Sequence, residues 1–233
     1  METYLRELVR KINIDLNDEM ADKFFLYKKL LLEWNEKINL TAITDEKEIL
    51  IKHFIDSLTI EKYIPQNAKI IDVGTGAGFP GIPLKIVRPD IEVVLLDSLN
   101  KRINFLNEVI KECRLENITA VHGRAEEIGN KPEYREKFDI STARAVANIS
   151  TLSELCTPFL KIGGFFVCMK ADAEQEIKNA KNALEILGMK EEKVEYITLP
   201  NIGAKRTIIL YKKEKNTPSK YPRKPGTPSK EPL

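Results

Sequence analysis

One glycine-rich segment, residues 70–81, constrains the fold of this chain more than any other. It reads Ile-Ile-Asp-Val-Gly-Thr-Gly-Ala-Gly-Phe-Pro-Gly, so an apolar run ends in three glycines at alternate positions. Glycine adopts backbone angles that other residues avoid, which lets a strand turn sharply and brings bare N–H groups against a ligand. A turn without a ligand is the alternative, but three glycines destabilise the chain more than a simple turn requires. The segment therefore predicts a strand-to-helix turn that binds a nucleoside.

The glycine spacing indicates which nucleoside cofactor is bound. Dinucleotide folds use G-x-G-x-x-G to seat a pyrophosphate on a helix N-terminus, whereas this chain has G-x-G-x-G followed by the bulky Phe79-Pro80. Such a loop suits S-adenosylmethionine, which carries adenosine and an amino acid but no phosphate. Asp97 ends the next apolar run and can accept the ribose hydroxyls. A nicotinamide-dependent reductase would share this layout, but the glycine spacing argues against it.

From Ala68 onward, short apolar runs alternate with helical stretches, which is typical of a parallel sheet covered on both faces. We expect strands at residues 68–73, 92–97, 118–122, 138–143, 164–169, 193–198 and 206–212. We expect helices at residues 80–87, 100–114, 148–160 and 173–187. The link 200–205 is too short for a crossover helix, so the last two strands should form an antiparallel hairpin. The prediction is an α/β, Rossmann-like, seven-stranded sheet, mostly parallel, as in class I S-adenosylmethionine-dependent methyltransferases.

The segment that precedes this sheet is predicted to be helical. Apolar residues recur at spacings of three and four from Met20 to Ile38, after the candidate N-cap Asn17. A second helix is expected from about Asp45 to Tyr63. We therefore divide the chain into an N-terminal helical extension (1–64), a methyltransferase domain (65–213) and a basic, proline-rich tail (214–233).

Composition favours an intracellular protein whose basic charge lies at one end. Residues 212–233 carry seven Lys or Arg and two Glu, so their net charge is +5. The whole chain has a net charge of +2, so residues 1–211 have a net charge of −3. The tail has too few apolar residues to form a core, and we expect it to be extended or disordered when free and to attract RNA phosphates. The three cysteines suggest neither a disulfide framework nor a metal site, and no membrane segment is apparent, so we expect a cytoplasmic protein without a metal.

Several segments match a known family when they are taken together. They are Trp34-Asn35, Asn39-Leu40-Thr41, His53-Phe54-Ile55-Asp56-Ser57-Leu58, the glycine loop 72–84, Leu96-Asp97-Ser98-Leu99-Asn100-Lys101-Arg102 and Arg144-Ala145. Over roughly residues 20–213 the chain resembles the bacterial small-subunit rRNA guanine-N7 methyltransferases called RsmG or GidB. The resemblance implies a class I fold with an N-terminal helical extension, S-adenosylmethionine as cofactor, and N7 methylation of a guanine in the 530 loop of 16S rRNA.

The cofactor residues follow from the residue pattern and from this resemblance. The glycine loop, the end of the second strand and the segment after the third strand should together hold the cofactor. The candidates are Gly74, Gly76, Gly78, Phe79, Asp97, Ser98, Leu99, Ala125, Glu126 and Arg144. Asp97 and Glu126 could instead cap helices. Arg144 ends the fourth strand, where it could bind the methionine carboxylate or an RNA phosphate, or pair with a surface acid.

The substrate side is predicted from basic and imidazole side chains around the same sheet edge. His53 and Asp56 lie three residues apart on one helix face, so they could form a docking network or part of a guanine pocket. Lys170 and Arg206 could contact RNA or be solvated. Guanine N7 attacks with an in-plane lone pair and carries no proton, so we expect Arg144 to act by positioning and expect no general base.

The predicted partner is 16S rRNA, within a small-subunit particle, and the protein is expected to be a monomer away from membranes. A loop nucleotide is favoured because the base must leave its stack to enter a pocket. Methylation of another RNA or of a small molecule is one alternative. A non-enzymatic RNA-binding module is another, but such a module has no need of the glycine loop and Asp97.

Overall fold

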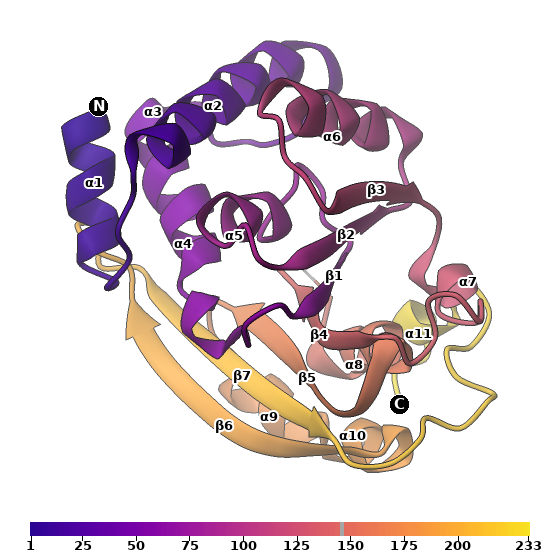
Figure 1. Cartoon of the computed structure of the whole chain (residues 1–233). Coiled ribbons are helices and arrows are strands. Elements are labelled where there is room, and N and C mark those ends of the chain that lie inside the picture. Colours follow the sequence, from indigo (N-terminus) through magenta and orange to yellow (C-terminus); the bar gives the residue numbers. More distant parts are fainter. Residues whose placement is uncertain (145–146) are drawn as a thin grey trace.

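The computed structural model describes residues 1–144 and 147–233 of the chain. Its centre is a seven-stranded sheet in the order β3-β2-β1-β4-β5-β7-β6 (Figure 1). The strands are β1 (Lys69–Val73), β2 (Glu92–Asp97), β3 (Ile118–His122), β4 (Phe138–Ala143), β5 (Leu160–Lys170), β6 (Met189–Thr198) and β7 (Lys205–Lys213). All seven predicted strands are present, and the α/β fold class is confirmed.

The strand register explains where a ligand can bind. β1 is parallel to both β2 and β4, while the chain leaves β1 first for β2 and β3 and returns later to β4. In such open sheets the crevice lies beyond the carboxyl ends of the strands where the order reverses. β7 is antiparallel to β5 and to β6, which confirms the predicted terminal hairpin.

Helices cover both faces of the sheet. One face packs against α5 (Gly81–Val87), α6 (Asn100–Glu112) and the N-terminal helices α1 (Glu2–Arg10) and α2 (Asp18–Ile38). The other face packs against α7 (Ala125–Ile128), α8 (Ile149–Cys156), α9 (Glu174–Asn179), α10 (Lys181–Leu187) and α11 (Thr227–Lys230). No helix among the described residues is long and apolar enough to cross a membrane.

The helical extension confirms one prediction and modifies another. The side chain of Asn17 accepts a hydrogen bond from Met20 N at 2.8 Å, so α2 begins at the predicted cap. The second helix is not continuous: it runs as α3 (Glu46–Ile49), a π-helical turn (Leu50–Ile55), α4 (Asp56–Leu58) and a 3₁₀ turn (Glu61–Tyr63). Two side chains bind the His53 carbonyl, Ser57 Oγ at 2.6 Å and Arg144 Nη1 at 3.3 Å, and they compete with regular helical bonding there.

The C-terminal tail was expected to be extended or disordered when free, and in the structure it is ordered against the domain. Residues 214–233 run along the outside of α7 and α8, and Tyr221 is only 5% exposed (Figure 1). Most of the segment is extended, as predicted, and α11 is its one regular element in the structure as described. The segment is ordered because it supplies partners to buried polar groups of the domain, above all Arg223 to the carboxylate of Glu154.

Candidate functional site

A cavity of about 640 Å³ lies at the carboxyl ends of β1, β4 and β5, where the helical extension meets the sheet. It brings together residues from both predicted sets, some of those for the cofactor and all three of those for the substrate. Its lining includes seven of the predicted residues: Gly74, Gly76, Phe79, Arg144, His53, Lys170 and Arg206. It does not include Gly78, Asp97, Ser98, Leu99, Ala125 or Glu126.

The glycines of the loop after β1 have different roles. Gly74, Gly76 and Gly78 all have positive φ angles, of 70°, 62° and 98°. A Cβ at Gly74 or Gly76 would meet no atom within 4 Å, so the backbone there is open to a ligand. A Cβ at Gly78 would lie 2.5 Å from Ile82 Cδ1, so this glycine is required for packing.

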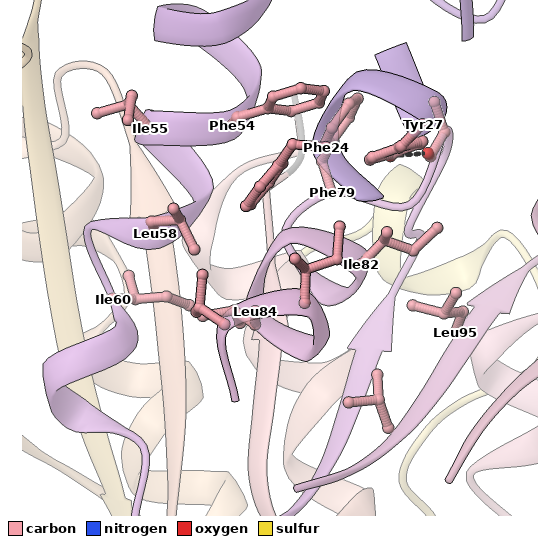
Figure 2. Close-up of a cluster of buried hydrophobic side chains, with 14 of the residues drawn as sticks. Phe24, Tyr27, Phe54, Ile55, Leu58, Ile60, Phe79, Ile82, Leu84 and Leu95 are labelled. Carbon is pink, nitrogen blue, oxygen red and sulfur yellow. Dashed lines mark hydrogen bonds between the residues drawn. The ribbon is translucent and has the colours of Figure 1, made fainter. Parts of the chain in front are cut away.

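The helical extension holds this loop in place. The hydroxyl of Tyr27 in α2 donates a hydrogen bond to the carbonyl of Ala77 (Figure 2). Phe54 and Phe79 pack in the same aromatic cluster, and both rings lie within 6.1 Å of each other and of Tyr27, centre to centre. The extension is thus part of the wall of the site.

Asp97 sits at the end of β2 with only 3% of its surface exposed. Its Oδ2 accepts from Gly76 N at 2.9 Å and from Arg102 Nη1 at 3.2 Å, and its Oδ1 accepts from Leu99 N at 2.9 Å. The carboxylate therefore links the glycine loop to the turn that contains Ser98 and Leu99. Arg102 also lines the cavity.

Ala125 and Glu126 begin α7, just after β3. β3 is the neighbour of β2, with His122 opposite Asp97, and Gly123 N donates to the Asp97 carbonyl at 3.0 Å. α7 therefore starts two residues after a main-chain contact with Asp97. The Glu126 side chain does not point into the cavity described above; its Oε1 accepts from Gly226 N at 2.9 Å.

Asp72, which precedes the glycine loop, is fully buried, and only one of its two carboxylate oxygens has hydrogen-bond partners. Its Oδ2 accepts from Thr75 Oγ1 at 2.6 Å and from Gly81 N at 2.9 Å, whereas its buried Oδ1 has no partner. Burial raises the pKa of this carboxyl to about 6. An unsatisfied carboxylate oxygen beside open glycine backbone fits a ligand that carries positive charge, as S-adenosylmethionine does.

Arg144 and Arg206 share one carboxylate, that of Asp56 in the helical extension. Arg206 Nε lies 3.1 Å from both oxygens of Asp56, and Arg144 Nη1 lies 3.5 Å from Asp56 Oδ2. Arg144 also places its guanidinium carbon 4.7 Å from the centre of the Phe79 ring. Burial raises the pKa of Asp56 although both guanidinium groups oppose this shift.

His53 is held in one orientation by three contacts. Its ring stacks on Phe79 at 4.5 Å, its Nδ1 lies 3.1 Å from Arg144 Nη2, and its Nε2 lies 2.8 Å from Thr41 Oγ1. A guanidinium can only donate, so Nδ1 is the acceptor and Nε2 carries the proton. Burial, together with the charge of Arg144, lowers the pKa of His53 to about 3. The imidazole is therefore neutral.

Lys170 is tied to a helix on the other side of the cavity. Its Nζ lies 2.9 Å from Glu176 Oε2 in α9 and donates to the carbonyl of Ala147 at 3.0 Å. The same oxygen of Glu176 accepts from Ile149 N, the first residue of α8, at 3.0 Å. Glu176 thus connects the end of β5 to the start of α8.

Sequence reasoning missed part of the cavity wall. Lys52, Arg102, Met169 and Glu176 line it, but none of the four was a predicted site residue. Lys52 follows Glu48 by four residues, which reads as an ordinary surface ion pair, and that ion pair is present at 2.7 Å. No sequence pattern marked Glu176 as a site residue, because its role depends on the packing of α9 against β5 and α8.

The strand order and the open glycine loop next to a buried acid define a class I S-adenosylmethionine-dependent methyltransferase. A solved S-adenosylmethionine-dependent methyltransferase from Aquifex aeolicus superposes with a TM-score of 0.56 at 15% identity, over 75% of this chain and 97% of that one. TYW2 from M. jannaschii, solved in complex with S-adenosylmethionine, superposes with a TM-score of 0.54 at 18% identity, over 68% of this chain and 76% of that one. These likenesses confirm the fold.

Sequence comparison defines the family within this class. The model of the family rRNA small subunit methyltransferase G matches residues 20–208, and the chain belongs to this family. The protein named ribosomal RNA small subunit methyltransferase G from Acetivibrio thermocellus is 57% identical over 94% of this chain and 91% of its own length. The protein of that name from Clostridium novyi is 49% identical over 98% and 96%. The resemblance and the cofactor predicted from the sequence are thus confirmed.

Proposed function

We propose that the chain methylates N7 of a guanine in the 530 loop of 16S rRNA and that the reaction takes place in the cavity between the glycine loop and the helical extension. The chain is an S-adenosylmethionine-dependent rRNA methyltransferase by family. The main observation in favour of this site is that Phe79 of the glycine loop lies against both His53 and Arg144. The cofactor loop and the predicted substrate residues therefore share one wall.

The cofactor is assigned to the glycine loop and the two strand ends beside it. When bound, S-adenosylmethionine supplies a methyl group on a positively charged sulfur. Gly74 and Gly76 offer open backbone, and Asp72 offers an unsatisfied carboxylate oxygen. Asp97, with Ser98 and Leu99, is assigned to the ribose, and Ala125 with Glu126 to the adenine, since these residues follow β2 and its neighbour β3.

The charge of the cavity supports an RNA substrate. Its wall holds five basic side chains and three acidic ones; the basic set is Lys52, Arg102, Arg144, Lys170 and Arg206. A positive cleft on a chain whose residues 1–211 are net negative attracts a phosphate backbone to one place. Lys170 and Arg206 are assigned to RNA phosphates or to the edge of the flipped base.

The residues of the wall position the base and move no proton. N7 of guanine has no proton to lose, and the only imidazole in the lining is neutral with both nitrogens engaged by Arg144 and Thr41. Arg144 is fixed by carbonyls at residues 52 and 53 and by Asp56, so its guanidinium is a rigid donor. Catalysis then depends on alignment of the methyl group with N7 and on fixed dipoles.

The wider setting follows from the substrate. We propose that the enzyme acts as a monomer, in the cytoplasm, on a small-subunit particle in which the loop nucleotide is accessible. Residues 1–64 and 65–213 act together, because Tyr27 and His53 of the extension contact the glycine loop of the domain.

Transfer from radiolabelled S-adenosylmethionine to naked 16S rRNA and to small-subunit particles tests the proposal. Reduction with borohydride followed by aniline cuts RNA at 7-methylguanosine, so primer extension should show one new stop in the 530 loop. Methylated RNA that resists this cleavage would show that another atom is the acceptor. Label on particles but not on naked RNA would support the particle as substrate, and the reverse would exclude it.

A further inference from the structure

The C-terminal segment, residues 214–233, contacts the part of the domain that is assigned to the adenine ring. We call this segment the strap. It leaves β7, passes α7 and ends at α11 against α8, as the yellow trace in Figure 1 shows. Four of its residues are buried, Thr217, Tyr221, Pro222 and Pro228. The strap is therefore part of the packed domain.

The strap is anchored on α8 by a charged pair. The Glu154 side chain is fully buried, and its Oε2 lies 2.6 Å from Arg223 Nη2. Its Oε1 accepts from Arg223 Nε at 2.9 Å and from Arg223 N at 2.8 Å. A buried carboxylate is costly without a partner, so this pair fixes the position of residue 223. A second anchor is Thr151 Oγ1, which donates to the Pro228 carbonyl at 2.9 Å.

From this anchor the strap holds α7 and the turn after it. Gly226 N donates to Glu126 Oε1 at 2.9 Å, and neither residue lines the cavity. Pro222 packs against Gly129: a Cβ added at Gly129 would lie 3.3 Å from Pro222 Cγ. Arg135, beyond α7, donates to the Tyr221 carbonyl at 2.8 Å and to the Thr217 carbonyl at 3.0 Å.

α7 is a short element that depends on such support. It has four residues, and helices of this length are not stable without tertiary contacts. It follows β3, an edge strand, and starts two residues after the main-chain contact of Gly123 with Asp97. The strap therefore determines the position of Ala125 and Glu126 relative to Asp97, the acid assigned to the ribose.

We propose that the strap is a positioning element for cofactor binding, in which Arg223 and Gly226 hold α7 at the adenine subsite. The inference rests on the cofactor role proposed above for Ala125 and Glu126. It differs from the expectation drawn from charge alone, in which the tail attracts RNA. The arginine that the strap shares with Glu154 is engaged in packing, while Lys224 and Lys230 are exposed.

Two neighbouring substitutions separate these roles. Arg223→Ala and Lys224→Ala each remove one positive charge, but only the first breaks the anchor on Glu154. We expect Arg223→Ala to weaken S-adenosylhomocysteine binding about three- to tenfold, the range of one lost hydrogen bond. The KM for S-adenosylmethionine should rise, with kcat at saturating cofactor and the KM for RNA unchanged. Lys224→Ala should leave cofactor binding unchanged.

Hydrogen exchange tests the link through α7 directly. The amides of Ile128 and Gly129 bond to the carbonyls of residues 124 and 125, and their exchange should accelerate in Arg223→Ala. Arg223→Lys keeps a charge beside Glu154 but not the planar fork, so it should fold and show a smaller effect of the same kind.

Three outcomes would overturn the inference. Equal losses of RNA affinity in Arg223→Ala and Lys224→Ala, with cofactor binding intact, would make the segment an RNA tether. Unchanged exchange at α7 in both Arg223 variants would show that the strap does not hold this helix. Faster exchange with unchanged cofactor affinity would remove Ala125 and Glu126 from the cofactor site, while methylation at N7 would stand on its own test.

Discussion

Arg144 donates from Nη2 to Nδ1 of His53 across 3.1 Å, and this contact fixes the tautomer of the imidazole. Burial disfavours the charged imidazole, and the positive charge of the guanidinium acts in the same direction. His53 therefore works as a rigid, neutral surface next to Phe79. This arrangement fits a reaction in which the acceptor nitrogen has no proton to remove.

The first prediction concerns acid stability. The pKa of His53 is about 3 in the folded protein, against 6.5 for a free imidazole, so the unfolded chain binds more protons between these values. The contribution of His53 to the free energy of unfolding should fall as the pH drops from 6.5 towards 3. Asp72, whose pKa of about 6 lies above its ordinary value of 3.8, acts in the opposite direction.

Because these two groups oppose each other, the test compares the wild type with His53→Gln. Urea unfolding at pH 7 and pH 5 gives the free energy of unfolding of each protein. The advantage of the wild type over His53→Gln should be smaller at pH 5 than at pH 7. An advantage that grows at pH 5 would contradict the neutral imidazole.

Arg144→Lys should lower the rate of methylation about 10- to 100-fold, since a lysine cannot reproduce charge-assisted bonds to two carbonyls, Asp56 and His53 together. The melting temperature should fall as well, because these contacts join β4 to the helical extension. Steady-state transfer to RNA measures the first effect and calorimetry the second. Arg114→Lys, at an exposed position, is the matched control and should change neither the methylation rate nor the melting temperature.

Asp97→Ala should weaken S-adenosylhomocysteine binding by about 1–3 kcal/mol, because a charged acceptor for the ribose is lost and the amides of Gly76 and Leu99 lose their partner. Titration calorimetry measures this change. Glu92→Ala alters the other end of the same strand and should leave the affinity as it is. Equal affinity in Asp97→Ala and the wild type would remove Asp97 from the cofactor site.

Glu176→Gln should raise the KM for RNA about three- to tenfold and leave cofactor affinity unchanged, because it takes the charge partner from Lys170 without emptying its position. Glu174→Gln, two residues earlier in the same helix and exposed, serves as the control. A normal KM for RNA in Glu176→Gln would indicate that the orientation of Lys170 is not used for the substrate.

Local patterns in the sequence predicted the strands well but not all of their ends. β5 begins at Leu160, earlier than the predicted 164, because the glycines at 163 and 164 weaken the strand pattern in the sequence. In the structure the strand continues through them, and the register against β4 shifts at this point. β6 begins at Met189, earlier than 193, since its first half is an exposed, charged edge that carries no apolar signal.

The site was predictable where one segment carries its own chemistry. The glycine loop and Asp97 were proposed from spacing and Arg144 from its place at a strand end, and the structure brings the loop and Arg144 to one cavity. Asp56 as a shared partner of two arginines was not, because Arg206 lies 150 residues away and only the packing of β7 against the extension brings them together. The order of the strap was not predicted for a related reason. Composition indicates how much core a segment can form by itself, but not whether buried polar groups elsewhere in the domain require it as a partner.

The strap also has a consequence for the order in which the protein is completed. It follows β7, so a ribosome makes it after every strand of the described sheet and after the α7 and α8 residues that it holds. During translation the sheet can form while the adenine side still lacks its support. By our proposal, the nascent chain gains full affinity for its cofactor only once residues 221–228 have emerged, which delays activity until synthesis of the domain is finished.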